Sequence, residues 1–158
     1  MKIILEGVDG AGKTTLAKIL ANEYGLDICH CTQHDPADYE FYKNTARKEN
    51  IVWDRHTIGE LVYPKIFGRE PQISPEDARL VLHYARSEGA KIFVLTTDLP
   101  TLRQRLLARG GEDPRILDNL KEIDDKFRFY AHAFHIQIIN TQILTLDEIF
   151  YLIDREEN

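Results

Sequence analysis

The most informative stretch of this chain is Gly7-Val8-Asp9-Gly10-Ala11-Gly12-Lys13-Thr14-Thr15, which follows the apolar run Ile3-Ile4-Leu5. The spacing Gly-x4-Gly-Lys-Thr predicts a glycine-rich turn between a strand and a helix, with backbone N–H groups facing inward around anionic oxygens. In such a loop Lys13 reaches the β- and γ-phosphates, and the hydroxyl of Thr14 can bind Mg²⁺. The candidate nucleotide-binding residues of the loop are Gly7, Asp9, Gly10, Ala11, Gly12, Lys13, Thr14 and Thr15.

Size and charge narrow the classes of protein. The 158 residues suffice for one domain, and 43% apolar with 29% charged residues is typical of a soluble globular chain. The net charge of −6 argues against coating nucleic acid by bulk charge, although it leaves room for a local basic patch. The sequence has no apolar run of the roughly 20 residues that span a bilayer, and no signal peptide is recognisable. Its two cysteines, Cys29 and Cys31, form no disulfide framework, so we expect a cytoplasmic location.

Strand and helix patterns alternate along the chain and predict an α/β fold with a mostly parallel sheet covered on both faces. The expected strands are Lys2–Glu6, Asp27–Gln33, Ile51–Asp54, Lys91–Thr97 and His135–Asn140. The expected helices are Gly12–Tyr24, Asp35 to about Lys48, His56–Phe67, Ser74 to about Gly89, Leu99–Arg109, Pro114–Ala133 and Leu146–Asp154. Because ligands bind beyond the carboxyl ends of parallel strands, the candidate site residues are sought there.

A second candidate group ends the third expected strand. Asp54 can hold Mg²⁺ through water, and Arg55 presents a planar fork to a phosphate. A surface ion pair at a strand end is the structural alternative.

An arginine-rich segment follows the fourth expected strand. On a helix Arg105 and Arg109 share a face, and Gly110-Gly111 then breaks the helix. Phosphoryl transfer needs cations that approach on closure and exclude water, so we interpret residues 103–115 as a short lid. A solvated helix face with a glycine cap is the alternative.

These residues resemble the nucleoside monophosphate kinases, and thymidylate kinases most closely. The resemblance rests on Glu6–Thr15, Asp54-Arg55, the arginine-rich segment and the run Asn140-Thr141-x-x-x-Thr145-Leu-Asp-Glu-Ile149. The run from His56 to Arg69 resembles compact bacteriophage deoxynucleotide kinases. The resemblance implies a three-layer αβα P-loop kinase fold over residues 1–158, with a five-stranded parallel sheet of order 2-3-1-4-5. It also implies ATP and Mg²⁺ as cofactors, with a homodimer by analogy.

The resemblance also implies residue roles. Asp9 would contact the acceptor sugar hydroxyl, Arg55 would hold the phosphate at the transfer point, and Asp54 would lie near the metal. Arg105 or Arg109 would close on ATP, completing a catalytic set with Lys13. The turn at Asn140 and Thr141 would lie near adenine.

The sequence departs from the thymidylate kinase pattern in the region expected to bind the acceptor. Thymidylate kinases carry an arginine after the second strand, whereas Thr32–Asp38 contains none. Asp35-Pro36 instead resembles the acidic residue and proline of deoxynucleoside kinases, where the acid is the base for a hydroxyl. The structural alternative is that Asp35 caps a helix. Tyr63 and Arg69 are the remaining candidates for acceptor binding.

Three functions follow from these patterns. The leading hypothesis is an ATP-dependent, Mg²⁺-dependent kinase of a (deoxy)nucleoside monophosphate, similar to thymidylate kinase. The second is a kinase of a hydroxyl group on a deoxynucleoside or on a modified base in DNA. The third is a nucleotide-binding module without transfer activity.

Overall fold

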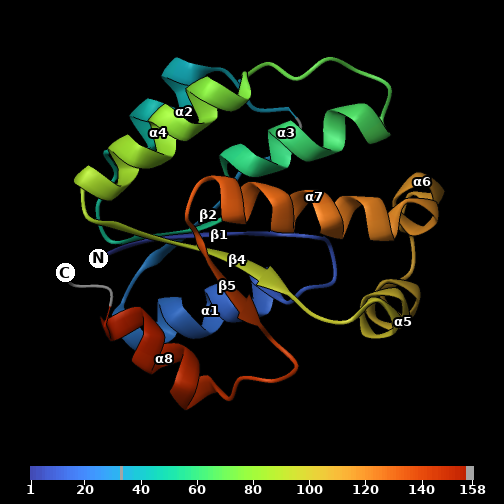
Figure 1. Cartoon of the computed structure of the whole chain (residues 1–158). Helices are drawn as coiled ribbons and strands as arrows, with labels where there is room; N and C mark the ends of the chain where they lie inside the picture. Colours follow the sequence, from blue (N-terminus) through green and yellow to red (C-terminus); the bar gives the residue numbers. More distant parts are fainter. Residues whose placement is uncertain (33, 156–158) are drawn as a thin grey trace.

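The computed structural model describes residues 1–32 and 34–155, and it has a five-stranded parallel sheet (Figure 1). The strands are β1 (Lys2–Gly7), β2 (Asp27–His30), β3 (Ile51–Asp54), β4 (Ala90–Thr96) and β5 (Gln137–Asn140). Their order is β2-β3-β1-β4-β5, which confirms the predicted order.

The strand register brings the ends of the strands to one edge. Leu5 of β1 pairs with Asp54 of β3, and Gly7 of β1 pairs with Leu95 of β4. All six residues of β1 are buried, as expected for a central strand covered on both faces. The loop that follows β1 therefore starts beside the carboxyl ends of its two neighbours.

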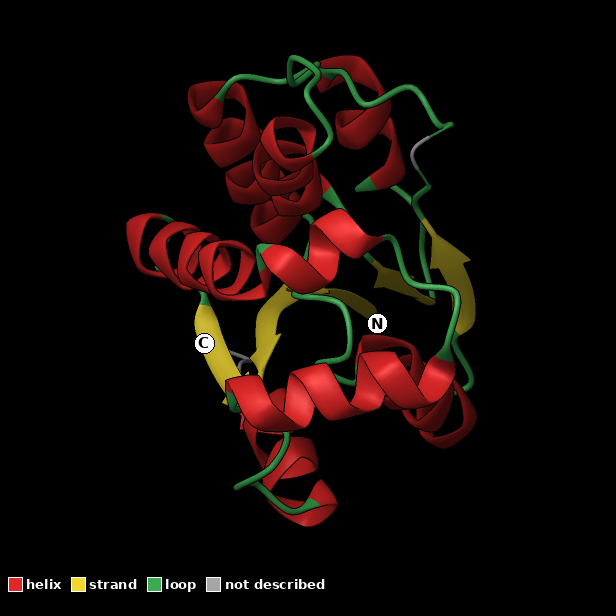
Figure 2. Cartoon of the chain, turned by 90° about the vertical axis from the view of Figure 1, so that its right-hand side faces the viewer, coloured by secondary structure: helices red, strands yellow, loops and turns green. Residues whose placement is uncertain are grey.

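Helices cover both faces of the sheet. The helices are α1 (Lys13–Tyr24), α2 (Tyr39–Thr45), α3 (Thr57–Ile66), α4 (Pro75–Ser87), α5 (Leu99–Arg109), α6 (Pro114–Asp118), α7 (Leu120–Ala133) and α8 (Leu146–Arg155). Figure 1 shows α1 and α8 below the sheet, and α2, α3, α4 and α7 above it. The helices α5 and α6, at the right of Figure 1, lie nearest the viewer in Figure 2, at the carboxyl edge of the strands.

Two helices differ from their predicted bounds by more than two residues, whereas the others agree to within two. The helix expected from Asp35 starts at Tyr39, because Asp38 caps it by accepting from the N–H of Phe41 at 2.9 Å. The helix expected over Pro114–Ala133 is interrupted at Asn119, whose side chain donates to the carbonyl of Arg115 at 2.8 Å and ends α6.

A smaller difference concerns β2. β2 ends at His30, and its predicted last residue, Gln33, lies outside the described residues. Within residues 1–32 and 34–155, the helices are too short or too polar to cross a bilayer.

Candidate active site

The glycine-rich loop lies between β1 and α1. Gly7, Gly10 and Gly12 have φ angles of 134°, 87° and 96°, which residues other than glycine rarely adopt. A Cβ atom on Gly7 would lie 2.2 Å from the carbonyl oxygen of Leu95 in β4. Since α1 begins directly after the loop, its free N–H groups and its positive dipole end point into the same space. The loop therefore has the backbone geometry of an anion site.

Lys13 lies inside this loop. Its Nζ donates to the carbonyl oxygens of Gly7 and Val8 at 2.7 and 3.0 Å and lies 3.6 Å from Asp9 Oδ1. Burial lowers the pKa of Lys13, and the charge of Asp9 opposes that shift. A phosphate that enters the loop offers this ammonium group stronger acceptors than neutral carbonyls do.

A cleft of about 670 Å³ opens above the loop and is here called the first cleft. Arg105 lines it and donates to the carbonyl of Gly10 at 3.0 Å. Thr141 lines it too, and its hydroxyl donates to the carbonyl of Ala11 at 2.9 Å. The apolar side chains of the first cleft are Leu16, Ile19, Leu106, Leu144, Leu146 and Ile149. This wall suits a flat apolar group such as a nucleotide base.

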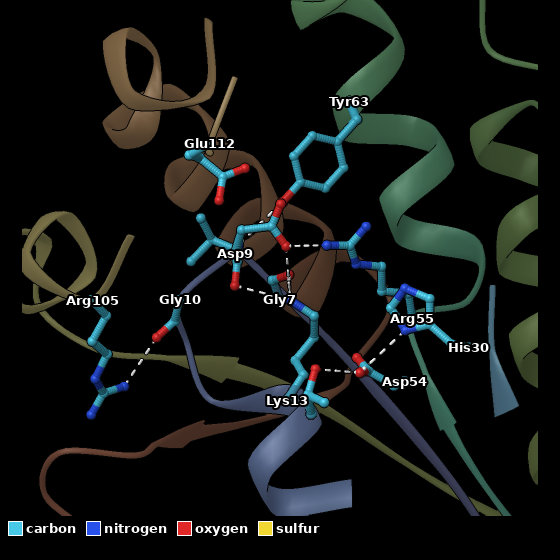
Figure 3. A network of polar contacts seen from close by, with 12 residues as sticks. Gly7, Asp9, Gly10, Lys13, His30, Asp54, Arg55, Tyr63, Arg105 and Glu112 are labelled. Atoms are coloured by element: carbon cyan, nitrogen blue, oxygen red, sulfur yellow. Dashed lines mark hydrogen bonds and ion pairs between the residues drawn. The ribbon is translucent and has the colours of Figure 1, made fainter. Parts of the chain in front are cut away.

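Thr14, which lines the first cleft, contacts Asp54 at the end of β3. The Thr14 hydroxyl donates to Asp54 Oδ2 at 2.5 Å, and His30 Nδ1 lies 3.2 Å from the same oxygen (Figure 3). Asp54 is 1% exposed, and its Oδ1 has no hydrogen-bond partner among the described residues. A buried carboxylate oxygen without a partner, next to a hydroxyl, fits a hydrated Mg²⁺.

The donor set for such an ion is small. In residues 1–32 and 34–155, no cluster of three or more His, Cys, Asp or Glu side chains is placed to hold a metal. Mg²⁺ commonly takes one or two protein oxygens and completes its shell with water and substrate phosphates. Thr14 and Asp54 match that pattern.

Asp9 joins the loop to α3. Its carboxylate forms an ion pair with Arg55, and its backbone N–H donates to the Tyr63 hydroxyl at 3.2 Å (Figure 3). Burial alone would raise the pKa of Asp9, but the charges of Lys13, Arg55 and Arg109 hold it below its usual value. Arg55 has a φ of 76°, a left-handed backbone that aims its side chain across the loop.

A second cleft of about 410 Å³ lies on the other side of Asp9. Its aromatic wall includes Tyr63 and Phe67, whose rings stack at 22° with centroids 6.2 Å apart. Arg69 lines it and makes two hydrogen bonds to Glu60, at 2.6 and 2.7 Å. The first and second clefts share Asp9, Arg55 and Arg109, so two ligands would meet across these three residues.

His56 also lines the second cleft, but it is poorly suited to binding a phosphate. Its ring nitrogens lie 2.8 Å from Thr45 Oγ1 and 2.5 Å from Thr57 Oγ1, and burial lowers its pKa to about 3. The imidazole is therefore neutral at physiological pH.

Five predicted site residues are absent from the linings of both clefts. Gly7 and Ala11 belong to the loop backbone, Asp54 accepts from Thr14 of the first cleft, and the other two are Asp35 and Asn140. Asp35 accepts from the N–H and hydroxyl of Thr32 at 2.6 and 3.0 Å, which closes a local turn and lowers its pKa. Asn140 accepts from the N–H of Gln142 at 3.0 Å and shapes the turn before Thr141. The described linings of the two clefts contain neither residue.

The arginine-rich segment divides into two parts. Leu102 and Leu106 of α5 are 0% and 1% exposed, so α5 is packed into the body of the protein. Residues 107–115 contain no buried residue, and both glycines after α5 have left-handed φ angles. Arg103 donates to the carbonyl of Leu117, and Arg115 donates to Asp113. These two arginines therefore bond to neighbouring residues rather than to the glycine-rich loop.

The structure adds residues that sequence reasoning missed. His30, Glu60, Phe67 and Glu112 line the second cleft. Phe67 lies four residues after Tyr63 and could have been found from helical spacing. Glu60 lies three residues before Tyr63 on α3 and carries the same signal. His30 and Glu112 had no local signal, because they reach the cleft from β2 and from the segment after α5.

A sequence model of the family described as AAA domain matches residues 3–126. The chain belongs to this family. It is 28% identical over 141 residues to cytidylate kinase 2 of Borreliella burgdorferi, covering 83% of this chain and 76% of the relative. It is 21% identical over 178 residues to the probable thymidylate kinase of Methanocaldococcus jannaschii, covering 94% of this chain and 91% of the relative.

Among solved structures, the YorR protein from Bacillus subtilis, in complex with phosphorylated GDP, has the same fold. Its TM-score is 0.81 at 23% sequence identity, covering 98% of this chain and 96% of that one. Family and relatives together identify the chain as a P-loop phosphotransferase. The relatives are named for different bases, so similarity does not select the acceptor.

Proposed function

We propose that this chain transfers the γ-phosphoryl group of ATP to a (deoxy)nucleoside monophosphate. The observation that carries the proposal is that the first and second clefts share Asp9, Arg55 and Arg109. A nucleotide in each cleft would bring its phosphates together between two guanidinium groups. In-line phosphoryl transfer requires this arrangement, because positioning and charge stabilisation supply most of its catalysis.

ATP would occupy the first cleft. Its phosphates would lie in the loop, with Lys13 turning from the Gly7 and Val8 carbonyls to the β- and γ-phosphates. Arg105 would reach the same phosphates from α5, and the base would lie against the apolar wall near Thr141. A Mg²⁺ ion held at Thr14 and Asp54 would neutralise charge that develops on the phosphates.

The acceptor would occupy the second cleft. Its phosphate would lie at Arg55, its sugar hydroxyl near Asp9, and its base beside Tyr63 and Phe67. Arg69 has both Nη atoms bonded to Glu60, which holds its guanidinium at the cleft wall as a hydrogen-bond donor. Such a donor favours a base with a carbonyl oxygen, which thymine, uracil, cytosine and guanine have and adenine lacks. Thymidylate is the first of these acceptors that we would test.

A hydroxyl acceptor finds less support. Asp35, its candidate base, is held by Thr32 outside the second cleft, and two arginines rather than a free carboxylate lie at the shared boundary. Cations suit a phosphate, whereas a hydroxyl needs a base.

An acceptor panel tests this proposal. The protein is incubated with ATP and Mg²⁺, ADP formation is followed, and thymidine, cytidine, uridine, guanosine and adenosine nucleosides are compared with their monophosphates in ribo and deoxy forms. We expect turnover with at least one monophosphate, and the Arg55→Ala variant should lose it. Turnover with nucleosides alone would contradict the monophosphate proposal and indicate a hydroxyl acceptor. Nucleotide binding without any turnover would indicate a binding module.

A further inference from the structure

Three guanidinium groups line the second cleft, and each is paired with a carboxylate that lines the same cleft. The pairs are Arg55 with Asp9, Arg69 with Glu60, and Arg109 with Glu112. A phosphate that binds an arginine here must share it with that carboxylate or displace the carboxylate. The three pairs differ in how strongly the carboxylate is held.

Two of the carboxylates have further partners. Asp9 Oδ1 lies 3.6 Å from Lys13 Nζ, in addition to its contact with Arg55. Glu60 accepts two hydrogen bonds from Arg69 and a third from the backbone N–H of Gln72 at 2.9 Å. Moving either carboxylate would break several contacts at once, so these two pairs are structural parts of the cleft wall.

Glu112 is held differently. In the part of the chain that the structure describes, Arg109 is its one hydrogen-bond partner. Its side chain is nevertheless only 10% exposed, whereas that of Arg109 is 57% exposed. Glu112 lines the second cleft together with Asp9 and Tyr63, and Figure 3 draws the three side chains in the same part of the site.

The backbone before Glu112 allows its carboxylate to move away from Arg109. Gly110 and Gly111 precede it with φ angles of 71° and 68°, and a Cβ on either would meet no atom within 4 Å. Arg109 itself sits on the last turn of α5, whose Leu106 is buried. The carboxylate can therefore move while the guanidinium stays anchored near both clefts.

We propose that Glu112 is a resident counter-ion of Arg109 that the acceptor phosphate displaces, and that this exchange selects phosphorylated acceptors. The inference rests on the proposed function. While Glu112 neutralises Arg109, the guanidinium is withheld from the γ-phosphate. An acceptor phosphate competes for Arg109 as a stronger anion, whereas water or an unphosphorylated nucleoside has no charge with which to compete.

The chemical step then follows from the exchange. An oxygen of the acceptor phosphate forms a bond to the γ-phosphorus of ATP, and the bond from that phosphorus to its β-bridging oxygen breaks, releasing ADP. Arg109, freed from Glu112, would face the charge on the transferring group. Glu112 acts through Arg109, which makes it a positioning residue rather than a catalytic one.

The test compares Glu112→Gln with the unmodified protein. The substitution keeps the size of the side chain and removes its charge. We expect the KM for the best monophosphate to fall about fivefold, as for loss of one competing charged contact, with the KM for ATP within about twofold. ATP hydrolysis without acceptor should rise, and the preference for monophosphate over nucleoside should shrink.

Glu122→Gln is the matched control, because Glu122 pairs with Lys126 at 3.2 Å and lines neither cleft. It should match the unmodified protein in all four readouts. In an Arg109→Ala background, Glu112→Gln should add no further increase in acceptor-free hydrolysis, because its partner is gone.

The outcomes separate the two proposals. A Glu112→Gln variant with unchanged or higher acceptor KM and unchanged acceptor-free hydrolysis would overturn the counter-ion, leaving monophosphate transfer intact. Absence of transfer to any monophosphate by the unmodified protein would overturn the proposed function itself.

Discussion

At the scale of single residues, Lys13 carries the largest expected effect. It is buried inside the phosphate loop, 2.7 Å from the carbonyl oxygen of Gly7, and is placed to swing onto the transferring phosphates. We expect Lys13→Ala to cost about 3 kcal/mol of transition-state stabilisation, which is roughly a hundredfold in kcat. Steady-state ADP formation measures this. Lys18→Ala, an exposed lysine on the same helix, should leave kcat unchanged, and equal rates for both variants would mean that the loop is misassigned.

Glu6 is a second residue whose charge has a measurable consequence. It is 0% exposed, and its Oε1 accepts from the N–H of Ile58 at 2.6 Å, so it caps α3, whose own N-cap residue His56 makes no side-chain cap bond. Burial raises the pKa of Glu6 to about 7. The folded protein therefore holds a proton that the unfolded chain releases at about pH 4.5.

The sign of the pH dependence follows. Below about pH 4.5 both states are protonated; between there and pH 7 ionisation favours the unfolded chain, so stability is lost as pH rises. We expect the free energy of unfolding of Glu6→Gln, relative to the unmodified protein, to rise by about 3 kcal/mol from pH 4.5 to pH 8. Urea titrations at several pH values measure this difference, and parallel curves for the two proteins would contradict it.

At the scale of elements, α5 connects the core to both clefts. Leu106 is 1% exposed and lies against the loop, since a Cβ on Gly10 would meet its Cγ at 3.3 Å. The same helix places Arg105 and Arg109 in the lining of the first cleft. The packing of Leu106 against the loop therefore fixes where α5 presents its two arginines.

We expect Leu106→Ala to destabilise the fold by about 2 to 5 kcal/mol, because it leaves a cavity beneath α5. The KM for ATP should rise as well, since Arg105 loses its anchor. Denaturant unfolding and ATP titration measure the two effects. The neighbouring Leu107 is 58% exposed, and its replacement by alanine should change neither; a large loss there would mean that α5 packs differently.

The element scale also shows where sequence reasoning stopped. The bounds of α5 and β3 match their predictions, because Asp98 caps α5 at the N–H of Thr101 and the apolar run of β3 ends at a charged pair. The start of α2 was wrong because Asp35 and Asp38 are both good cap residues. Ala37 is 6% exposed and packs inward, which leaves Asp38 to cap the helix.

At the scale of the whole molecule, ligand binding should stabilise the fold. A non-hydrolysable ATP analogue with Mg²⁺ at about 100 times its Kd adds about 2.7 kcal/mol, or roughly 5 to 10 °C in Tm. Adding the acceptor monophosphate should raise Tm further, because it fills the second cleft. Thermal unfolding measures both steps. Lys13→Ala should lose the first step. A monophosphate that raises Tm alone but gives no further rise once the analogue is saturating would mean that both ligands compete for one cleft. Assembly into a homodimer stays a prediction.

Sequence alone determined the alternation of strands and helices, the strand order implied by its resemblance, and the phosphate loop, because these depend on local spacing and on glycine conformations. It also indicated that Asp54 would end beside the loop, since parallel strands end at one edge. Tertiary structure decided which charges meet: Asp9 with Arg55, Glu60 with Arg69, and Glu112 with Arg109. Side-chain pairing across elements depends on distances of a few ångströms that only the packed sheet and helices set, and the carboxylates that compete for each arginine leave no trace in local sequence patterns.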